Sequence, residues 1–166
     1  LGRLGFDTLL LLPSPQQTEL DPASEKKQEN IDAFRRQFAE RIVKLGDAKL
    51  QEGGFKLLLA QGTSAAWAAN LITSEQLPAP DALVLLDGFF PNQLSNQTLA
   101  KQVAQASIPT LDLYQEDGGR WPLLAAEARQ SESRRSHKLN YRPYALMELG
   151  ETPGRIQGWL THLGWI

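Results

Sequence analysis

Ser64 is the residue whose neighbours best suit it for chemistry. It follows an apolar run at residues 55–60 and precedes an alanine-rich stretch, so it lies at a predicted strand-to-helix turn. Gly62 and Ala66 are small enough for the tight turn that lifts a central side chain above the end of a sheet. This G-x-S-x-A pattern predicts a nucleophile elbow with a positive φ at Ser64, and Ser64 is therefore the candidate nucleophile.

Other reactive groups are few. The chain has no cysteine, which excludes disulfides, thiolate metal sites and a cysteine nucleophile and leaves the compartment open. It also lacks the glycine-rich motifs that cradle nucleotide phosphates. Asp112, Glu116 and Asp117 carry oxygen ligands for a hard cation, but a carboxylate inside a strand and two adjacent loop carboxylates are commonplace. We therefore expect no metal and no cofactor.

The composition is that of one globular domain spanning residues 1–166, with 42% hydrophobic and 22% charged residues. The net charge of −2 provides no basic field to attract nucleic acid, and the basic cluster at residues 134–138 is interpreted as a solvated helix end. No apolar run approaches the ~20 residues that cross a bilayer, so no membrane is expected as a partner. No signal-peptide charge pattern precedes the first apolar run.

Predicted strands and helices alternate along the whole chain. Because strands separated by helices form parallel sheets covered on both faces, we predict an α/β, three-layer sandwich with a mainly parallel sheet of about five strands. Ligands of such sheets bind beyond the carboxyl ends of the strands. The predicted strands are residues 6–12, 55–60, 82–86, 110–114 and 141–149, and the predicted helices are a long one capped by Ser24 and ended by Gly53, then 65–73, 95–106, 122–135 and one from Pro153.

Four segments carry a resemblance to the α/β-hydrolase superfamily. They are LGFDTLLLLPSP at 4–15, AQGTSAAW at 60–67, LLDGFFP at 85–91 and IPTLDLY at 108–114. Their order and spacing resemble the carboxyl-terminal two-thirds of that fold and, more narrowly, an uncharacterised bacterial hydrolase-like domain of unknown function. The resemblance implies a bacterial protein of the periplasm or the cytoplasm.

The resemblance also assigns roles. Ser64 matches the nucleophile, and the backbone N–H of Ala65 would be one donor of the oxyanion hole. The acid position follows the strand 110–114, where Asp117 or its neighbour Glu116 would orient a histidine; as loop carboxylates, both are equally well explained by solvation alone. The second oxyanion donor would come from a loop that precedes Leu1.

The histidine itself is missing from its expected place. The segment just after the last strand carries Glu148 and Glu151 instead, and a carboxylate of pKa about 4 is a poor base for a serine proton. Only His137, before the last strand, and His162, in the terminal helix, have an imidazole. Both are more simply explained as surface or packing residues.

Three functions remain open. The preferred hypothesis is a hydrolase-like domain with an incomplete serine triad and a binding or structural role. The alternative is a serine hydrolase of carboxylic esters or thioesters that uses Ser64, Asp117 and His137, with a small-molecule ester as its partner. The third is a flavodoxin-like binding domain that happens to contain this turn.

In the hydrolase arrangement the strands 6–12 and 55–60 are not neighbours, because another strand lies between them. That strand would precede Leu1, so the resemblance implies that this chain is a fragment. We expect an upstream segment or a partner chain to complete the sheet, because two apolar strands would otherwise expose unpaired N–H and C=O groups. A continuous ladder between the two segments would instead favour the flavodoxin-like hypothesis.

Overall fold

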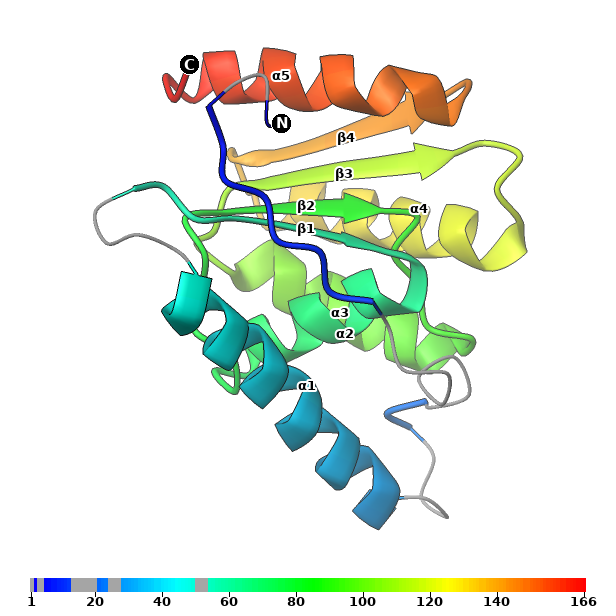
Figure 1. Ribbon diagram of the computed structural model, residues 1–166. Coiled ribbons are helices and arrows are strands. Elements are labelled where there is room, and N and C mark those ends of the chain that lie inside the picture. Colours follow the sequence, from blue (N-terminus) through cyan, green and yellow to red (C-terminus); the bar gives the residue numbers. More distant parts are fainter. Residues whose placement is uncertain (1, 3–4, 13–20, 24–27, 50–53) are drawn as a thin grey trace.

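Four parallel strands form the centre of the molecule in the computed structural model, which describes residues 2, 5–12, 21–23, 28–49 and 54–166 (Figure 1). The strands are β1 (Leu57–Gln61), β2 (Ala82–Leu86), β3 (Thr110–Gln115) and β4 (Tyr141–Leu146), side by side in that order. The helices are α1 (Gln28–Lys49), α2 (Gly62–Thr73), α3 (Gln93–Gln105), α4 (Arg120–Arg135) and α5 (Thr152–His162), with a 3₁₀ turn, η4 (Leu149–Glu151), before the last.

All strand pairs are parallel, in a regular register that sets Leu58 beside Leu83 and Val84 beside Leu111. Each strand must therefore be followed by a crossover that returns the chain to the amino end of the sheet. The helices α2, α3 and α4 are these crossovers. As a result, the carboxyl ends of all four strands lie at the same end of the sheet, and α2, α3 and α4 all begin there.

Helices cover both faces of the sheet, as a fully buried parallel sheet requires. Figure 1 shows α5 on one face, with α2, α3 and α4 on the other. In β2 the side chains alternate between the two faces: Leu83 and Leu85 pack with α1, α2 and α3, whereas Ala82, Val84 and Leu86 pack with α5. The expected three layers of an α/β fold are therefore present.

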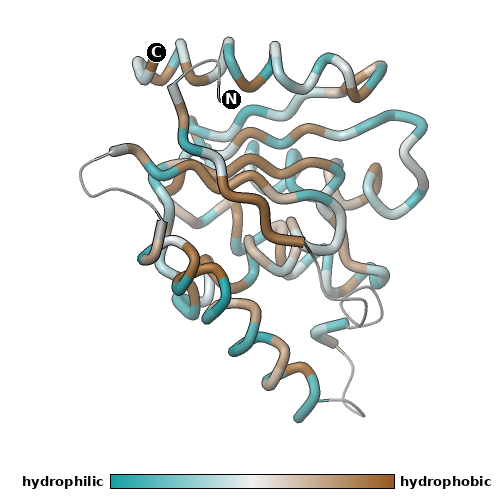
Figure 2. The backbone as a smooth tube through the Cα atoms, viewed as in Figure 1, coloured by the Kyte–Doolittle hydropathy of each residue, from teal (hydrophilic) through white to brown (hydrophobic). Residues whose placement is uncertain are grey.

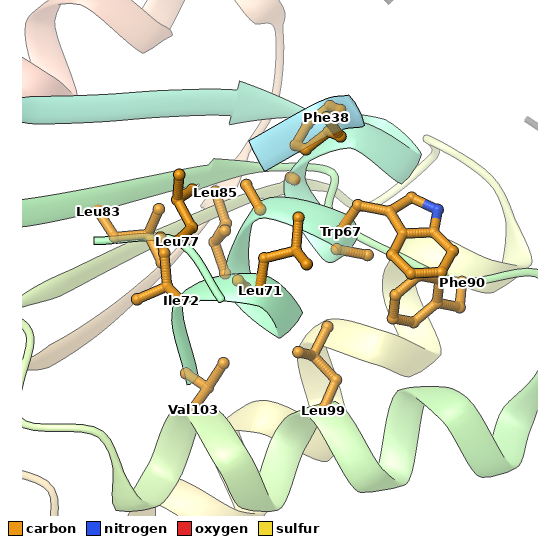
Figure 3. Close-up of a cluster of buried hydrophobic side chains, with 14 of the residues drawn as sticks. Phe38, Trp67, Leu71, Ile72, Leu77, Leu83, Leu85, Phe90, Leu99 and Val103 are labelled. Carbon is orange, nitrogen blue, oxygen red and sulfur yellow. The ribbon is translucent and has the colours of Figure 1, made fainter. Parts of the chain in front are cut away.

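The larger core cluster is centred on α2 and its aromatic neighbours (Figure 3). Trp67 is fully buried, with Phe90 edge-on to its ring at a centroid distance of 5.1 Å and Phe34 of α1 at the same distance. Leu71, one helical turn further on, points into the same cluster. This packing fixes α2 rigidly beneath the carboxyl ends of β1 and β2.

The fifth strand expected at residues 6–12 does not form. Among the described residues, nothing pairs with the outer edge of β1, and residues 6–12 lie outside the sheet. Phe6 packs against the cluster on the α5 face, whereas the carbonyl of Leu12 accepts a hydrogen bond from Arg41 of α1 at 3.3 Å. Because its two ends are held on opposite faces, the segment crosses the edge of the sheet instead of running along it.

Crossing the edge leaves the segment's apolar side chains in solvent. Leu10 is 81% exposed and Leu12 is 67% exposed. Figure 2 shows this hydrophobic stretch passing the outer edge of the sheet. The predicted N-cap Ser24 and the predicted helix end at Gly53 lie outside the described residues.

Candidate functional site

The turn that carries Ser64 differs in detail from the expected elbow. Positive φ occurs at Gly62 (+60°) and not at Ser64, so the expectation for Ser64 was wrong. Glycine has no Cβ and adopts this conformation at little cost, so the chain turns two residues earlier and Ser64 becomes the third residue of α2. The Ser64 side chain is half-buried at the carboxyl end of the sheet.

The loop after β2 packs tightly against the start of α2. A Cβ placed on Gly88 would lie 3.1 Å from the Cβ of Ala65, and the N–H of Phe89 donates to the carbonyl of Gly62 at 3.4 Å. Ala65 is fully buried. In a regular helix the amide of this fourth residue bonds to the carbonyl of the residue before the helix, so the role of Ala65 as an oxyanion donor stays a prediction.

Asp87 is the first residue after β2, in the loop that packs against the start of α2. It is only 9% exposed and has φ of +48°, in the left-handed region that is costly for most residues with a Cβ and that Asp adopts more readily than others. Its Oδ1 accepts a hydrogen bond from the backbone N–H of Gln115 at 2.8 Å. Burial raises the pKa of Asp87 above its ordinary value, although the Gln115 hydrogen bond acts in the opposite direction.

Asp87 was not among the sequence-predicted site residues. A signal for it existed, because Asp87-Gly88 is a turn dipeptide immediately after a buried strand. A strained backbone and a destabilised charge are both typical of functional positions. The structure therefore adds Asp87 to the candidate site.

Asp117 and Glu116 lie in the loop between β3 and α4 and are both exposed. The next residue, Gly118, passes close to Asp87: a Cβ placed on it would lie 3.5 Å from Asp87 Oδ1. The charge on Asp117 contributes to the raised pKa of Asp87. The predicted acid, Asp117, thus lies at the carboxyl end of the sheet, as Ser64 does.

Neither histidine lies at the carboxyl end of the sheet. His137 follows the C-cap residue of α4 and has φ of +53°, and its N–H donates to the carbonyl of Arg134, an arrangement common just after helix ends. The next residue, Lys138, donates to the carbonyl of Ile108, just before β3 begins. His137 is therefore exposed at the amino end of the sheet, about 16 Å of strand length away from the edge that carries Ser64.

His162 is the last residue of α5 and is also exposed. Three residues after that helix, Trp165 stacks on Phe55, which precedes β1, with ring centroids 4.3 Å apart. This contact places the end of α5 at the amino end of the sheet as well. Both histidines of the chain thus lie at the amino end of the sheet, opposite to the carboxyl end that carries Ser64.

The acidic residues after β4 have a structural role. Glu151 accepts the N–H of Met147 at 2.9 Å and pairs with Arg155 at 2.7 Å. The hydrogen bond from Arg155 and that from Met147 lower the pKa of Glu151, so its carboxylate is a still weaker base than usual. The two carboxylates of Glu148 and Glu151 form a capping box at η4.

Asp112 is committed to a buried cluster beneath the candidate site. Arg129 donates to both of its carboxylate oxygens, at 2.7 and 3.0 Å, and the Tyr141 hydroxyl donates to Oδ2. The remaining Arg129 amino group donates to the carbonyl of Gly88 at 2.7 Å. Asp112, Arg129 and Tyr141, which we call the buried clamp, therefore hold the loop that carries Asp87.

Burial alone would lower the pKa of Arg129, but the adjacent Asp112 raises it overall. Burial raises the pKa of Tyr141 and Asp112 raises it further, so the hydroxyl remains a donor. In the described part of the chain, no three acidic or histidine side chains meet as a metal site.

An open parallel sheet with α-helical crossovers and a candidate site at its carboxyl edge defines this protein as an α/β domain. A family model described as a protein of unknown function (DUF3530) matches residues 12–165, and the chain belongs to that family. Searches of curated proteins and of solved structures found no match. None of the helices in the described ranges combines the length and apolar character needed to cross a bilayer.

We expect Asp87→Asn to be more stable than the wild type at pH 7. Because the folded-state pKa of Asp87 is raised, its charged form opposes folding above that pKa, and the penalty disappears below the unfolded-state value of about 4. Asparagine keeps an acceptor for the backbone N–H of Gln115 but carries no charge. Urea unfolding should show a stability difference at pH 7 that closes as the pH falls below 4.

Asp87→Ala is the matched control, because it removes the acceptor together with the charge. It should be less stable than Asp87→Asn at every pH. A difference between Asp87→Asn and the wild type that persists unchanged at pH 3 would show that the carboxylate charge is not its cause.

Proposed function

We propose that this protein is a hydrolase-like α/β domain with an incomplete serine triad that acts as a binding or structural protein. The observation that supports this is the position of the two histidines. Both lie at the amino end of the sheet, whereas Ser64, Asp87 and Asp117 lie at its carboxyl end. Neither imidazole of the chain is therefore placed to take the proton of Ser64, and a serine hydroxyl that no base activates is a weak nucleophile at neutral pH.

Purified protein should not react with a fluorophosphonate probe, which reports activated serines. The measurement is stoichiometric labelling at neutral pH, followed by peptide mapping. Thr63→Ala is the matched control for Ser64→Ala, since the two hydroxyls are adjacent in α2. Labelling that is lost in Ser64→Ala but kept in Thr63→Ala would contradict the proposal.

That same outcome would support the alternative, a serine hydrolase of carboxylic esters or thioesters. The features in its favour are the small residues around Ser64 and the two acidic residues, Asp87 and Asp117, at the same edge of the sheet. In that case the base is not His137 or His162 in the described arrangement. A histidine base would then have to come from outside these 166 residues, because the chain has only two histidines.

We further propose that another strand pairs with the outer edge of β1, supplied by an upstream segment or a partner chain. The support is an edge that no described residue pairs with and the exposed side chains of Leu10, Leu12 and Leu59 near it. The ladder between residues 6–12 and β1, which would favour a flavodoxin-like domain, is not present in the described residues.

Hydrogen exchange tests the strand proposal. In this 166-residue chain, the outward-facing amides of β1 should exchange much faster than those of β2, because β2 is paired on both sides. Equal protection of the two strands in a monomer would show that the β1 edge is already satisfied.

A further inference from the structure

A groove between α3 and α4 has the chemistry of a small-anion site. It has a volume of about 280 Å³, which is slightly below the usual range for drug-sized ligands. None of its lining residues belongs to α2 or to the sheet, so it is separate from the candidate site around Ser64. The lining residues are Gln93, Asn96 and Gln97 from α3 and Arg120, Trp121, Leu124 and Ala128 from α4.

Arg120 is the only charged residue among those that line the groove. It is exposed, and in the described residues its one recorded interaction is with the ring of Trp121, whose centroid is 5.8 Å from the guanidinium carbon. A guanidinium without a carboxylate partner presents its planar fork of donors to a carboxylate or phosphate. Gln97, also exposed, adds an uncharged amide to the same groove.

The remaining wall is apolar. Trp121 is half-buried, and Leu124 is 39% exposed within the groove. By contrast, the side chain of Asn96 is engaged with the backbone, because it accepts from the N–H of Phe90 and donates to its carbonyl, each at 2.7 Å. The groove therefore offers one cation, free amides and a flat apolar surface.

We propose that this groove binds a small organic anion in which a carboxylate or phosphate is attached to a flat apolar body. The anion pairs with Arg120, and the body lies against Trp121 and Leu124. Charge and apolar contact are both required, because a single exposed ion pair contributes little on its own.

The test follows the indole N–H signal of Trp121 by NMR, assigned with Trp121→Phe. The probes are 3-phenylpropionate, phenyl phosphate, inorganic phosphate and the uncharged 3-phenylpropanol. We expect saturable shifts with the first two probes only, and their relative affinities show which anionic group is preferred. Equal binding of 3-phenylpropanol, or shifts that do not saturate with either aromatic anion, would overturn the proposal.

Matched variants locate the binding. Arg120→Gln should weaken binding by about fivefold, equivalent to about 1 kcal/mol, and Gln97→Glu should weaken it by charge repulsion. Their controls are Arg134→Gln and Gln105→Glu, exposed residues at the far ends of the same two helices, which should bind as the wild type does. Unchanged affinity in Arg120→Gln would overturn the proposal, whatever the result of the Ser64 labelling.

Discussion

Arg129→Met should destabilise the protein by about 3–5 kcal/mol, because it leaves the fully buried carboxylate of Asp112 without its counter-charge. Typical domains have a total stability of about 5–15 kcal/mol, so this loss is a large fraction of the whole. Methionine preserves much of the side chain's volume and keeps the change one of charge and hydrogen bonding. The measurement is the free energy of unfolding in urea at pH 7.

A triple variant identifies the cause. Replacing the whole clamp, Arg129→Met with Asp112→Leu and Tyr141→Phe, should recover most of the loss, since no buried charge remains.

Arg134→Met, on the exposed face of the same helix, is the control and should change stability by no more than about 0.5 kcal/mol. If Arg129→Met cost as little as this control, the clamp would not hold the fold together. The clamp also has a local effect, because its bond to the Gly88 carbonyl holds the loop next to Asp87. A looser loop in Arg129→Met should appear as broadened amide signals at Asp87 and Gly88.

Local sequence predicts the buried elements of this protein well. The strand 82–86 has the predicted bounds, because a short apolar run between turn residues favours a strand that is buried on both faces of a parallel sheet. The helix after β1 begins three residues before its predicted start, because Gly62 takes the turn. These outcomes depend on residues within one element, which is the range over which a pattern acts.

Features that depend on distant residues were not predicted. Residues 6–12 have the same apolar pattern as a buried strand, but contacts with distant residues hold Phe6 on one face of the sheet and Leu12 on the other, so the segment crosses the open edge of β1 without pairing with it. The buried clamp joins Asp112 to residues 17 and 29 positions away, which no local pattern reveals. The strain at Asp87 arises in the same way, from its hydrogen bond to β3 and the contact of Gly88 with α2.

For the candidate site, the sequence correctly indicated which edge of the sheet would carry Ser64 and Asp117, because parallel strands all end at one edge. It could not locate the histidines in space. His137 follows Ser64 and Asp117 along the chain, and chain order alone satisfies the triad. However, His137 lies just after the crossover helix α4, which brings the chain back to the amino end of the sheet.

The tight contact between α2 and the β2 loop leads to the last prediction. Ala66→Leu should destabilise the protein by about 1–3 kcal/mol through overpacking. Ala66 is 1% exposed within the core cluster around α2, so there is little room for three more carbon atoms. Leucine is almost as good a helix former as alanine, so a loss of this size reflects packing and not helix propensity.

Urea unfolding of Ala66→Leu measures this cost, with Ala79→Leu on an exposed loop as the control for the same chemical change. The control should stay within about 0.5 kcal/mol of the wild type. In Ala66→Leu the added bulk must be fitted into the core cluster around α2, so the amide signals of Leu71 and Phe90 should shift more than those of β4. A variant as stable as the wild type would mean that small residues at this turn are not required by the fold, and the steric argument for an elbow-like turn around Ser64 would fail with it.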